Sequence, residues 1–413
     1  MIPAETEPGL PRSTQKFTVP VIWLLVALAV VFVWRYFLSG AANLIPDECS
    51  YWSWSRRLDW SYFDNSGMVA YLIRLSTWLF GESTPFSVRF PFLVLSGFTT
   101  YLIYRVSFLL FGNRLAGLIA ATLFNLTPLA LLGGSAAVHD TALVFFWMVA
   151  LWTGALFLKS GDGRWFYAMG LAAGLCIQSK YTGVLVPLCL LIFLLWSKEH
   201  RQRLLTREPW IGALIALLFA VPILVWNAAH DWASFHHILF IGSGAQSVTK
   251  RLSDGLGYHV AQLALVSPLF YFALVVGVVA AILGNLRARK PEEVLLLSFG
   301  FPLLLFGVFA FKGHVSELGL HGIPLHRHTG RSGDSVQIGR WRRTAPREVV
   351  RVAICQMGDD SGSGTGRSRR RARVVWPSSS VLGKEMGQGG SRYLGDARLE
   401  GACRACGKNQ EGG

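Results

Sequence analysis

The chain has 413 residues, of which 52% are hydrophobic and only 15% are charged, and its formal net charge is +15. Soluble domains of this size usually carry about 25% charged residues, so the composition argues against an ordinary soluble enzyme. We read the excess of basic residues as membrane topology rather than as affinity for nucleic acid, and nucleic acid is not expected as a partner.

Residues 1–17 are expected to form a cytoplasmic N-terminal segment, and long apolar runs then recur from residue 18 to residue 312. Because a membrane-spanning helix needs about 20 mainly apolar residues, these runs predict about nine spans. The sequence therefore predicts an all-α, polytopic membrane protein with a transmembrane domain over residues 18–312. The predicted spans are 18–38, 90–111, 115–133, 141–158, 165–177, 182–196, 210–227, 261–284 and 293–311.

The connections between the predicted spans differ in composition on the two sides of the membrane. One set is basic throughout, and the positive-inside rule places it in the cytoplasm. The other set is rich in Trp, Tyr, His and carboxylates, and its longest member, residues 39–89, is a large first outer loop. Chemistry is therefore expected on the outer face. The basic residues are Arg114, Lys159, Arg164, Lys198, Arg201, Arg203, Arg207, Arg287, Arg289 and Lys290.

The hydrophobic pattern ends at about Gly313, and residues 313–413 form a basic, low-complexity tail rich in Gly, Arg and Ser. Such a tail cannot bury enough apolar surface to fold, so it is expected to be disordered if it is translated as written. A second interpretation is a frameshift near residues 312–316. The codons from His314 to Pro324 can be read in a neighbouring frame as a membrane-associated segment that contains Ala-Asn-Trp.

Carboxylates gather on the predicted outer face, where they are costly unless they are hydrated or used. The run from Pro46 to Trp52 contains Asp47 and Glu48, and Asp64 follows in the same outer segment. His139-Asp140 opens the fourth predicted span, and Lys180-Tyr181 lies where the fifth span ends. Helix capping is the structural alternative for the aspartates, and snorkelling to the interface is the alternative for Lys180.

Taken in order, these motifs resemble those of the GT-C glycosyltransferases. The run Asp47-Glu48-x-x-Tyr51-Trp52 followed by Tyr62-Phe63-Asp64 is similar to the first outer loop of the family 39/83-like branch. That branch includes the dolichyl-phosphate-mannose protein mannosyltransferases and the aminoarabinose transferase that acts on lipid A. The likeness covers about residues 18–314. One departure is Asn65-Ser66-Gly67, where the family commonly has His-Pro-Pro, and this leaves the local loop geometry open.

The resemblance implies a GT-C-type helical bundle that transfers a sugar, with inversion, from a polyprenyl-phosphate donor to an acceptor hydroxyl. Asp47 would be the catalytic base. Lys180 would stabilise the leaving phosphate, and a divalent metal ion is an open alternative. The acceptor, whether lipid, glycan or protein, is not specified. The other residues expected to bind the donor phosphate or its sugar are Glu48, Asp64, His139, Asp140 and Tyr181.

The resemblance also implies a bacterial inner-membrane protein whose active site faces the periplasm and whose surroundings are membrane lipids. Two rival functions remain at this point. A transporter or lipid flippase would be favoured by charges and helix breaks at the middle of the membrane, whereas the carboxylates here lie in outer segments. A truncated, inactive transferase is the second rival, because a frameshift would remove the late spans.

Overall fold

The protein is described here from a computed structural model, which covers residues 19–240, 248–268, 271–272, 275–276, 279 and 290–310. Within these ranges every regular element is a helix, apart from one isolated β-bridge between Ser61 and Ser66. The predicted all-α fold class is confirmed. The predictions for residues 1–17 and for the tail at 313–413, including the frameshift, lie outside the described residues.

Among the described residues, four helical segments are long and apolar enough to cross a membrane: α1 (Val19–Ala41), α4 (Pro85–Phe111), α7 (His139–Ser160) and the pair α10 (Glu208–Leu218) and α11 (Val221–Ala229). Three shorter apolar helical segments accompany them, at Met68–Phe80, Arg114–Leu126 and Tyr181–Trp196. The chain is thus an integral membrane protein with several candidate spans. The count of about nine stays a prediction.

The remaining helices are shorter or lie at the ends of the bundle. They are α2 (Pro46–Arg56), α3 (Met68–Phe80), α5 (Arg114–Leu126), α6 (Pro128–Gly133), α8 (Trp165–Ser179), η1 (Tyr181–Val184), α9 (Leu185–Trp196), η2 (Arg201–Leu205), α12 (Ala233–Phe240), α13 (Val248–Val266) and α15 (Pro291–Ala310).

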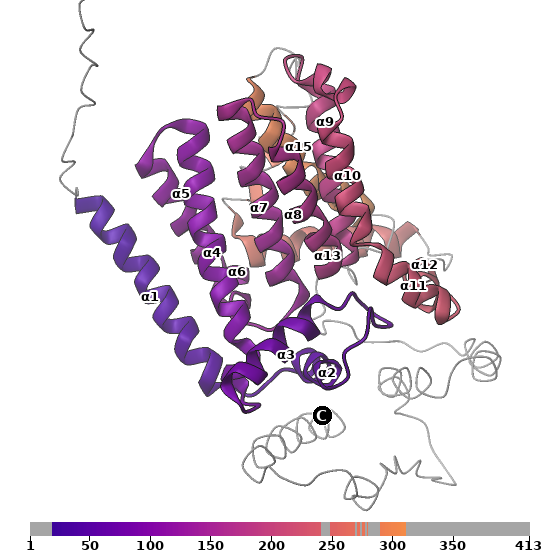
Figure 1. Ribbon diagram of the computed structural model, residues 1–413. Coiled ribbons are helices and arrows are strands. Elements are labelled where there is room, and N and C mark those ends of the chain that lie inside the picture. Colours follow the sequence, from indigo (N-terminus) through magenta and orange to yellow (C-terminus); the bar gives the residue numbers. More distant parts are fainter. Residues whose placement is uncertain are drawn as a thin grey trace, which may run out of the picture.

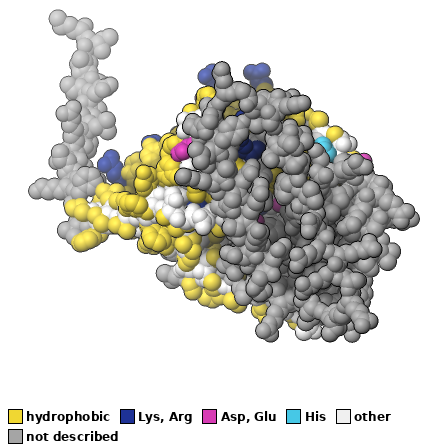
Figure 2. Space-filling view, turned by 90° about the horizontal axis from the view of Figure 1, so that it is seen from below, with side chains coloured by type: hydrophobic (Ala, Val, Ile, Leu, Met, Phe, Trp, Pro, Cys, Tyr) yellow, Lys and Arg dark blue, Asp and Glu magenta, His cyan; other side chains and the backbone are white. Residues whose placement is uncertain are grey.

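The helices α4, α7, α8, α9, α10 and α15 form the centre of the bundle, and α1 lies along its flank (Figure 1). Their main core is made of buried side chains such as Phe157, Met169, Phe193 and Leu295. On the outside, large apolar side chains stay exposed, for example Trp23 at 67% and Val30 at 62%. Figure 2 shows hydrophobic side chains over much of the described surface that is visible from the α2 end. Such a surface suits contact with lipid.

Proline interrupts one predicted span. Residues 115–133 were expected as a single helix, but the structure ends α5 at Leu126 and begins α6 at Pro128. Proline has no backbone N–H and restricts the residue before it to extended conformations, and Thr127 is extended. The hydroxyl of Thr127 then accepts a hydrogen bond from the Ala130 N–H at 3.2 Å and caps the new helix.

The segment 39–89, which was predicted as a large loop, folds into the helices α2 and α3 at one end of the bundle (Figure 1). A small second core, which includes Trp52, Val69, Ile73 and Phe92, joins these two helices to α4. Gly81 ends α3 with a left-handed φ of 72°, a conformation that glycine adopts without steric cost. This packing gives the outer end a rigid base.

A buried arginine ties the flanking helix α1 to the bundle. Arg35 is fully buried, and its guanidinium donates to Ser96 Oγ at 2.8 Å, Asn125 Oδ1 at 2.7 Å and the Ala130 carbonyl at 2.5 Å. These partners belong to α4, α5 and α6. Since polar groups in a membrane interior need internal partners, this cluster orients α1 against three helices.

Candidate active site

The predicted outer residues converge around one side chain, Tyr51 of α2. Burial raises the pKa of the Tyr51 hydroxyl above its usual value, and the charges of Asp47, Asp64 and Asp140 raise this pKa further. Three carboxylates that are far apart in the sequence therefore act on the same hydroxyl. The structure brings together α2, the Asp64 turn and the start of α7.

Asp47 lies in the first turn of α2 and is partly buried. The positive end of the helix dipole favours a carboxylate there. Asp47 and Tyr51 are four residues apart in one helix, so their side chains share a face. Pro46 at the first helical position sets the local geometry, because its fixed φ suits a helix start. The aspartate is thus held on a short, rigid helix.

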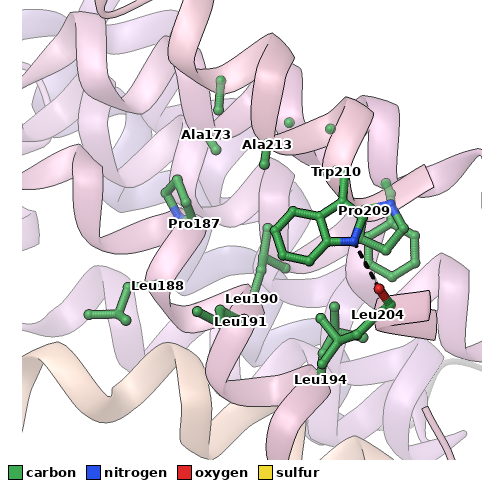
Figure 3. Close-up of a pocket in the computed structure, with 14 residues that line it drawn as sticks. Ala173, Pro187, Leu188, Leu190, Leu191, Leu194, Leu204, Pro209, Trp210 and Ala213 are labelled. Carbon is green, nitrogen blue, oxygen red and sulfur yellow. Dashed lines mark hydrogen bonds between the residues drawn. The ribbon is translucent and has the colours of Figure 1, made fainter. Parts of the chain in front are cut away.

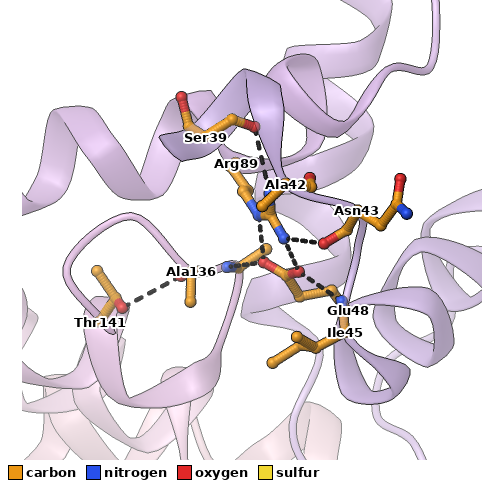
Figure 4. Close-up of polar contacts among 9 residues, drawn as sticks. Ser39, Ala42, Asn43, Ile45, Glu48, Arg89, Ala136 and Thr141 are labelled. Atoms are coloured by element: carbon orange, nitrogen blue, oxygen red, sulfur yellow. Dashed lines mark hydrogen bonds and ion pairs between the residues drawn. The ribbon is translucent and has the colours of Figure 1, made fainter. Parts of the chain in front are cut away.

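Glu48 occupies a different environment from Asp47. It is fully buried, and Arg89 of α4 donates to both of its oxygens, at 2.8 and 2.6 Å (Figure 4). The backbone amides of Ala137 and Ile45 donate to the same carboxylate at 2.9 and 3.0 Å. Both oxygens are therefore occupied, and in this conformation neither is available to a phosphate or a sugar. The structure gives Glu48 a supporting position in place of the predicted donor contact.

Arg89 extends this support to the end of α1. It donates to the carbonyl oxygens of Ala42 and Asn43, both at 2.7 Å, and to that of Ser39 at 3.3 Å. The pair of Glu48 and Arg89 therefore joins the end of α1, the start of α2, the helix α4 and the segment before α7 (Figure 4). Charged groups buried in this way need such complete pairing.

Asp140 and Lys180 form a second ion pair, and the structure brings these two predicted residues together. Lys180 Nζ lies 2.9 and 3.2 Å from the two carboxylate oxygens of Asp140. The Asp140 side chain is 59% exposed, whereas that of Lys180 is only 15% exposed. Lys180 stands in extended backbone between α8 and η1. An exposed carboxylate can release such a lysine to an incoming anion.

His139 is buried and does not face solvent. The edge of its ring packs against Tyr51, with ring centroids 4.4 Å apart, and Trp54 lies 6.1 Å away. Its Nε2 is buried without a hydrogen-bond partner in the described structure. The structure therefore buries His139 against Tyr51, and its predicted contact with the donor stays a prediction.

Tyr181 links the site to the outer segment. Its hydroxyl lies 3.2 Å from Ser61 Oγ and donates to the Tyr62 carbonyl at 3.4 Å. Asp64 lies in the same turn, between Tyr62 and the Ser66 end of the bridge. The Asn65-Ser66-Gly67 departure is also part of this turn, and Ser66 Oγ donates to the Ile177 carbonyl at 3.1 Å. The turn is therefore docked against the end of α8.

Several residues outside the predicted set of site residues also build this site. The rings of Trp54 and Tyr62 stack with centroids 4.5 Å apart. Ser234 Oγ donates to the Tyr62 carbonyl at 3.2 Å, and the Ser234 N–H donates to Asn227 Oδ1, also at 3.2 Å. The only signal for Asn227 was a polar residue in an apolar run. The segment around α11 and α12 thus completes one side of the site.

In the part of the chain that the structure describes, no three His, Cys, Asp or Glu side chains come together in a way that could hold a metal ion. Asp47, Asp64 and Asp140 each act on Tyr51, but they do not form such a group. The predicted divalent ion stays a prediction without a ligand set among these residues.

The fold and this arrangement define an integral membrane protein with a polar, carboxylate-containing site at one end of a helical bundle. Residues 64–226 match the family described as dolichyl-phosphate-mannose-protein mannosyltransferase. The matched segment includes Asp64, His139, Asp140, Lys180 and Tyr181. The family resemblance seen in the sequence is confirmed.

Individual relatives agree with this family. The chain is 27% identical over 284 residues to the lipid A galacturonosyltransferase RgtD of Rhizobium johnstonii, covering 68% of this chain and 58% of that protein. It is 30% identical over 319 residues to an undecaprenyl phosphate-alpha-4-amino-4-deoxy-L-arabinose arabinosyl transferase of Sodalis glossinidius, covering 70% and 54%. The chain thus spans little more than half the length of these relatives.

A solved structure with similar features is that of ArnT from Cupriavidus metallidurans bound to undecaprenyl phosphate. The sequence identity is 17% and the TM-score is 0.47, over 83% of this chain and 66% of that one.

Proposed function

We propose that this protein is an inverting glycosyltransferase that moves a sugar from a polyprenyl-phosphate donor to an acceptor hydroxyl on the outer face of a bacterial inner membrane. The observation that supports this most is the convergence of Asp47, Asp64 and the pair of Asp140 and Lys180 around Tyr51. The family match over residues 64–226 and the names of the relatives support it.

In the proposed reaction, Asp47 takes the proton of the acceptor hydroxyl while the hydroxyl oxygen attacks the anomeric carbon of the sugar. A new carbon–oxygen bond forms on one face as the bond to the phosphate breaks on the other, which inverts the configuration. The proton ends on Asp47 and the electron pair leaves with the phosphate. Positioned general bases of this kind contribute about 10²–10⁴-fold to the rate.

Lys180 would receive the leaving phosphate. Its partner Asp140 holds the ammonium group at 2.9 Å, and an incoming phosphate would compete for it. A preorganised cation stabilises charge that grows during bond cleavage more than water can, because it needs no reorientation. Asp64 lies in the turn that Tyr181 contacts, and in the proposed reaction it lies near the sugar.

The test uses membranes that contain the full chain, the Asp47→Asn variant or the Asp162→Asn variant. Asp162 is an exposed aspartate beyond the other end of α7, so its change serves as the matched control. Each preparation receives radiolabelled undecaprenyl-phosphate sugars, and loss of label from the lipid fraction is measured. We expect Asp47→Asn to reduce turnover by about 100-fold or more and the control to retain it.

A second set of membranes contains the same three proteins with the reading frame restored after residue 312. Turnover only in this set, and its loss in Asp47→Asn, would support the proposal and show that the late residues are required. Equal turnover in Asp47→Asn and in the parent would reject Asp47 as the base. No transfer by well-folded protein from any donor, together with transport of the donor across vesicles, would favour the flippase alternative.

A further inference from the structure

A second site lies at the opposite end of the bundle from the residues discussed above. The helices α8, α9 and α10 enclose an apolar groove of about 240 Å³, shown in Figure 3 and called the α8–α10 groove below. Its lining consists of Gly, Ala, Pro, Leu, Phe and Trp residues. The indole N–H of Trp210 is already engaged, since it donates to the Leu204 carbonyl at 2.8 Å. The groove therefore offers apolar contact and no group for catalysis.

The groove exists because α8 and α10 cross very closely. A Cβ on Gly170 would lie 2.1 Å from the Gly212 carbonyl oxygen, and a Cβ on Gly212 would lie 2.3 Å from the Phe166 carbonyl oxygen. Only glycine allows this contact, as in other close helix crossings in membranes. The two glycines recess the floor, while α9 side chains such as Leu191, which is 40% exposed, form one wall. The resulting slot is open toward the lipid-facing side of the bundle.

Basic side chains are concentrated in the segment 197–209, which joins α9 to α10 and contributes Leu204 and Pro209 to the groove. The segment 197–209 carries Lys198, Arg201, Arg203 and Arg207 against two glutamates. Arg203 is engaged with the Gly161 carbonyl at 2.7 Å and with the Phe157 ring, but Arg201 and Arg207 are exposed. Leu204 and Trp210, which line the groove, are close to both arginines in sequence. Trp210 is 59% exposed, and an indole in such a position is typical of the headgroup level of a membrane.

We propose that the α8–α10 groove binds one acyl chain of an anionic phospholipid, whose phosphate is held by Arg201 and Arg207. The apolar slot suits a hydrocarbon chain, and the positive charge at its end suits an anionic headgroup. The basic segment is cytoplasmic by the positive-inside rule, so the lipid belongs to the cytoplasmic leaflet. This site is separate from the proposed sugar transfer at the outer end and does not depend on it.

The experiment is native mass spectrometry of the full chain, purified in detergent and mixed with equal amounts of phosphatidylglycerol and phosphatidylcholine. Two changes address the two halves of the site. Arg201→Gln with Arg207→Gln removes the headgroup contact, and Ala213→Phe fills the groove. The matched controls are Arg114→Gln, an exposed arginine at the start of α5, and Leu217→Phe, an exposed α10 side chain outside the groove lining.

We expect the parent protein to retain at least about fivefold more phosphatidylglycerol than phosphatidylcholine. This factor corresponds to the attraction between one basic side chain and an anionic lipid. The double arginine variant should lose this preference, and Ala213→Phe should lower retention of both lipids, whereas the controls should behave like the parent. Equal retention of both lipids by the parent would overturn the proposal. A preference for phosphatidylglycerol that survives both changes would also overturn it. The same holds if a second copy of the chain occupies the groove and is released by Ala213→Phe.

Discussion

The candidate site contains two ion pairs with opposite properties. The pair of Glu48 and Arg89 is buried, with side chains 0% and 6% exposed, and backbone groups complete its hydrogen bonds. The pair of Asp140 and Lys180 has an aspartate that is 59% exposed. A buried pair with every oxygen occupied can only support the structure around it. A half-exposed pair can exchange one partner for a ligand, so the difference favours a structural role for the first pair and a binding role for the second.

The largest expected effect is on the buried pair. Arg89→Leu leaves the Glu48 carboxylate buried with only backbone donors, and breaking a buried pair in this way costs about 3–5 kcal/mol. We expect a marked loss of thermal stability in detergent. The exposed Arg114→Leu is the control and should unfold like the parent.

A double variant sharpens this result. If Glu48 and Arg89 are both changed to Leu, no charge is left unpaired, so the double variant should be more stable than Arg89→Leu alone. A double variant that is less stable than either single change would contradict the view that the pair acts as one structural unit.

The next effect concerns Lys180 and should appear in activity rather than in stability. Removal of one preorganised electrostatic donor typically lowers turnover by about 10²–10³-fold. We expect Lys180→Gln to lose transfer of sugar from undecaprenyl phosphate to this extent, with an unfolding temperature close to that of the parent. A variant that unfolds like Arg89→Leu would show instead that Lys180 is a structural residue.

The smallest effect on stability is expected for Asp140→Asn. Exposed ion pairs contribute about 0–1 kcal/mol, because water screens them and the side chains lose entropy when they pair. Thermal unfolding of this variant should therefore differ little from that of the parent. If Asp140 competes with the phosphate for Lys180, donor affinity should stay the same or increase, and a titration with undecaprenyl phosphate would measure it. A stability loss comparable to that of Arg89→Leu would remove the distinction between the two pairs.

Much of the candidate site could be located from the sequence because its residues flank apolar runs. Asp47, Asp140 and Lys180 each lie where a hydrophobic segment begins or ends, and the ends of successive spans meet at a membrane face. The sequence could not distinguish Glu48 from Asp47, since neighbouring carboxylates look alike until their partners are known. The partner of Glu48 is 41 residues away, and the partner of Lys180 is 40 residues away.

The sequence by itself determined that this is a helical membrane protein, because transfer of apolar side chains out of water is a local property that each segment has alone. From the composition of the connections it also predicted which end carries the chemistry. The tertiary structure decided which charges are paired, which face of α2 meets α7, and how closely α8 approaches α10. Those features depend on contacts between distant segments. Buried polar groups must find hydrogen-bond partners on distant segments, and only the packed bundle specifies which groups become partners.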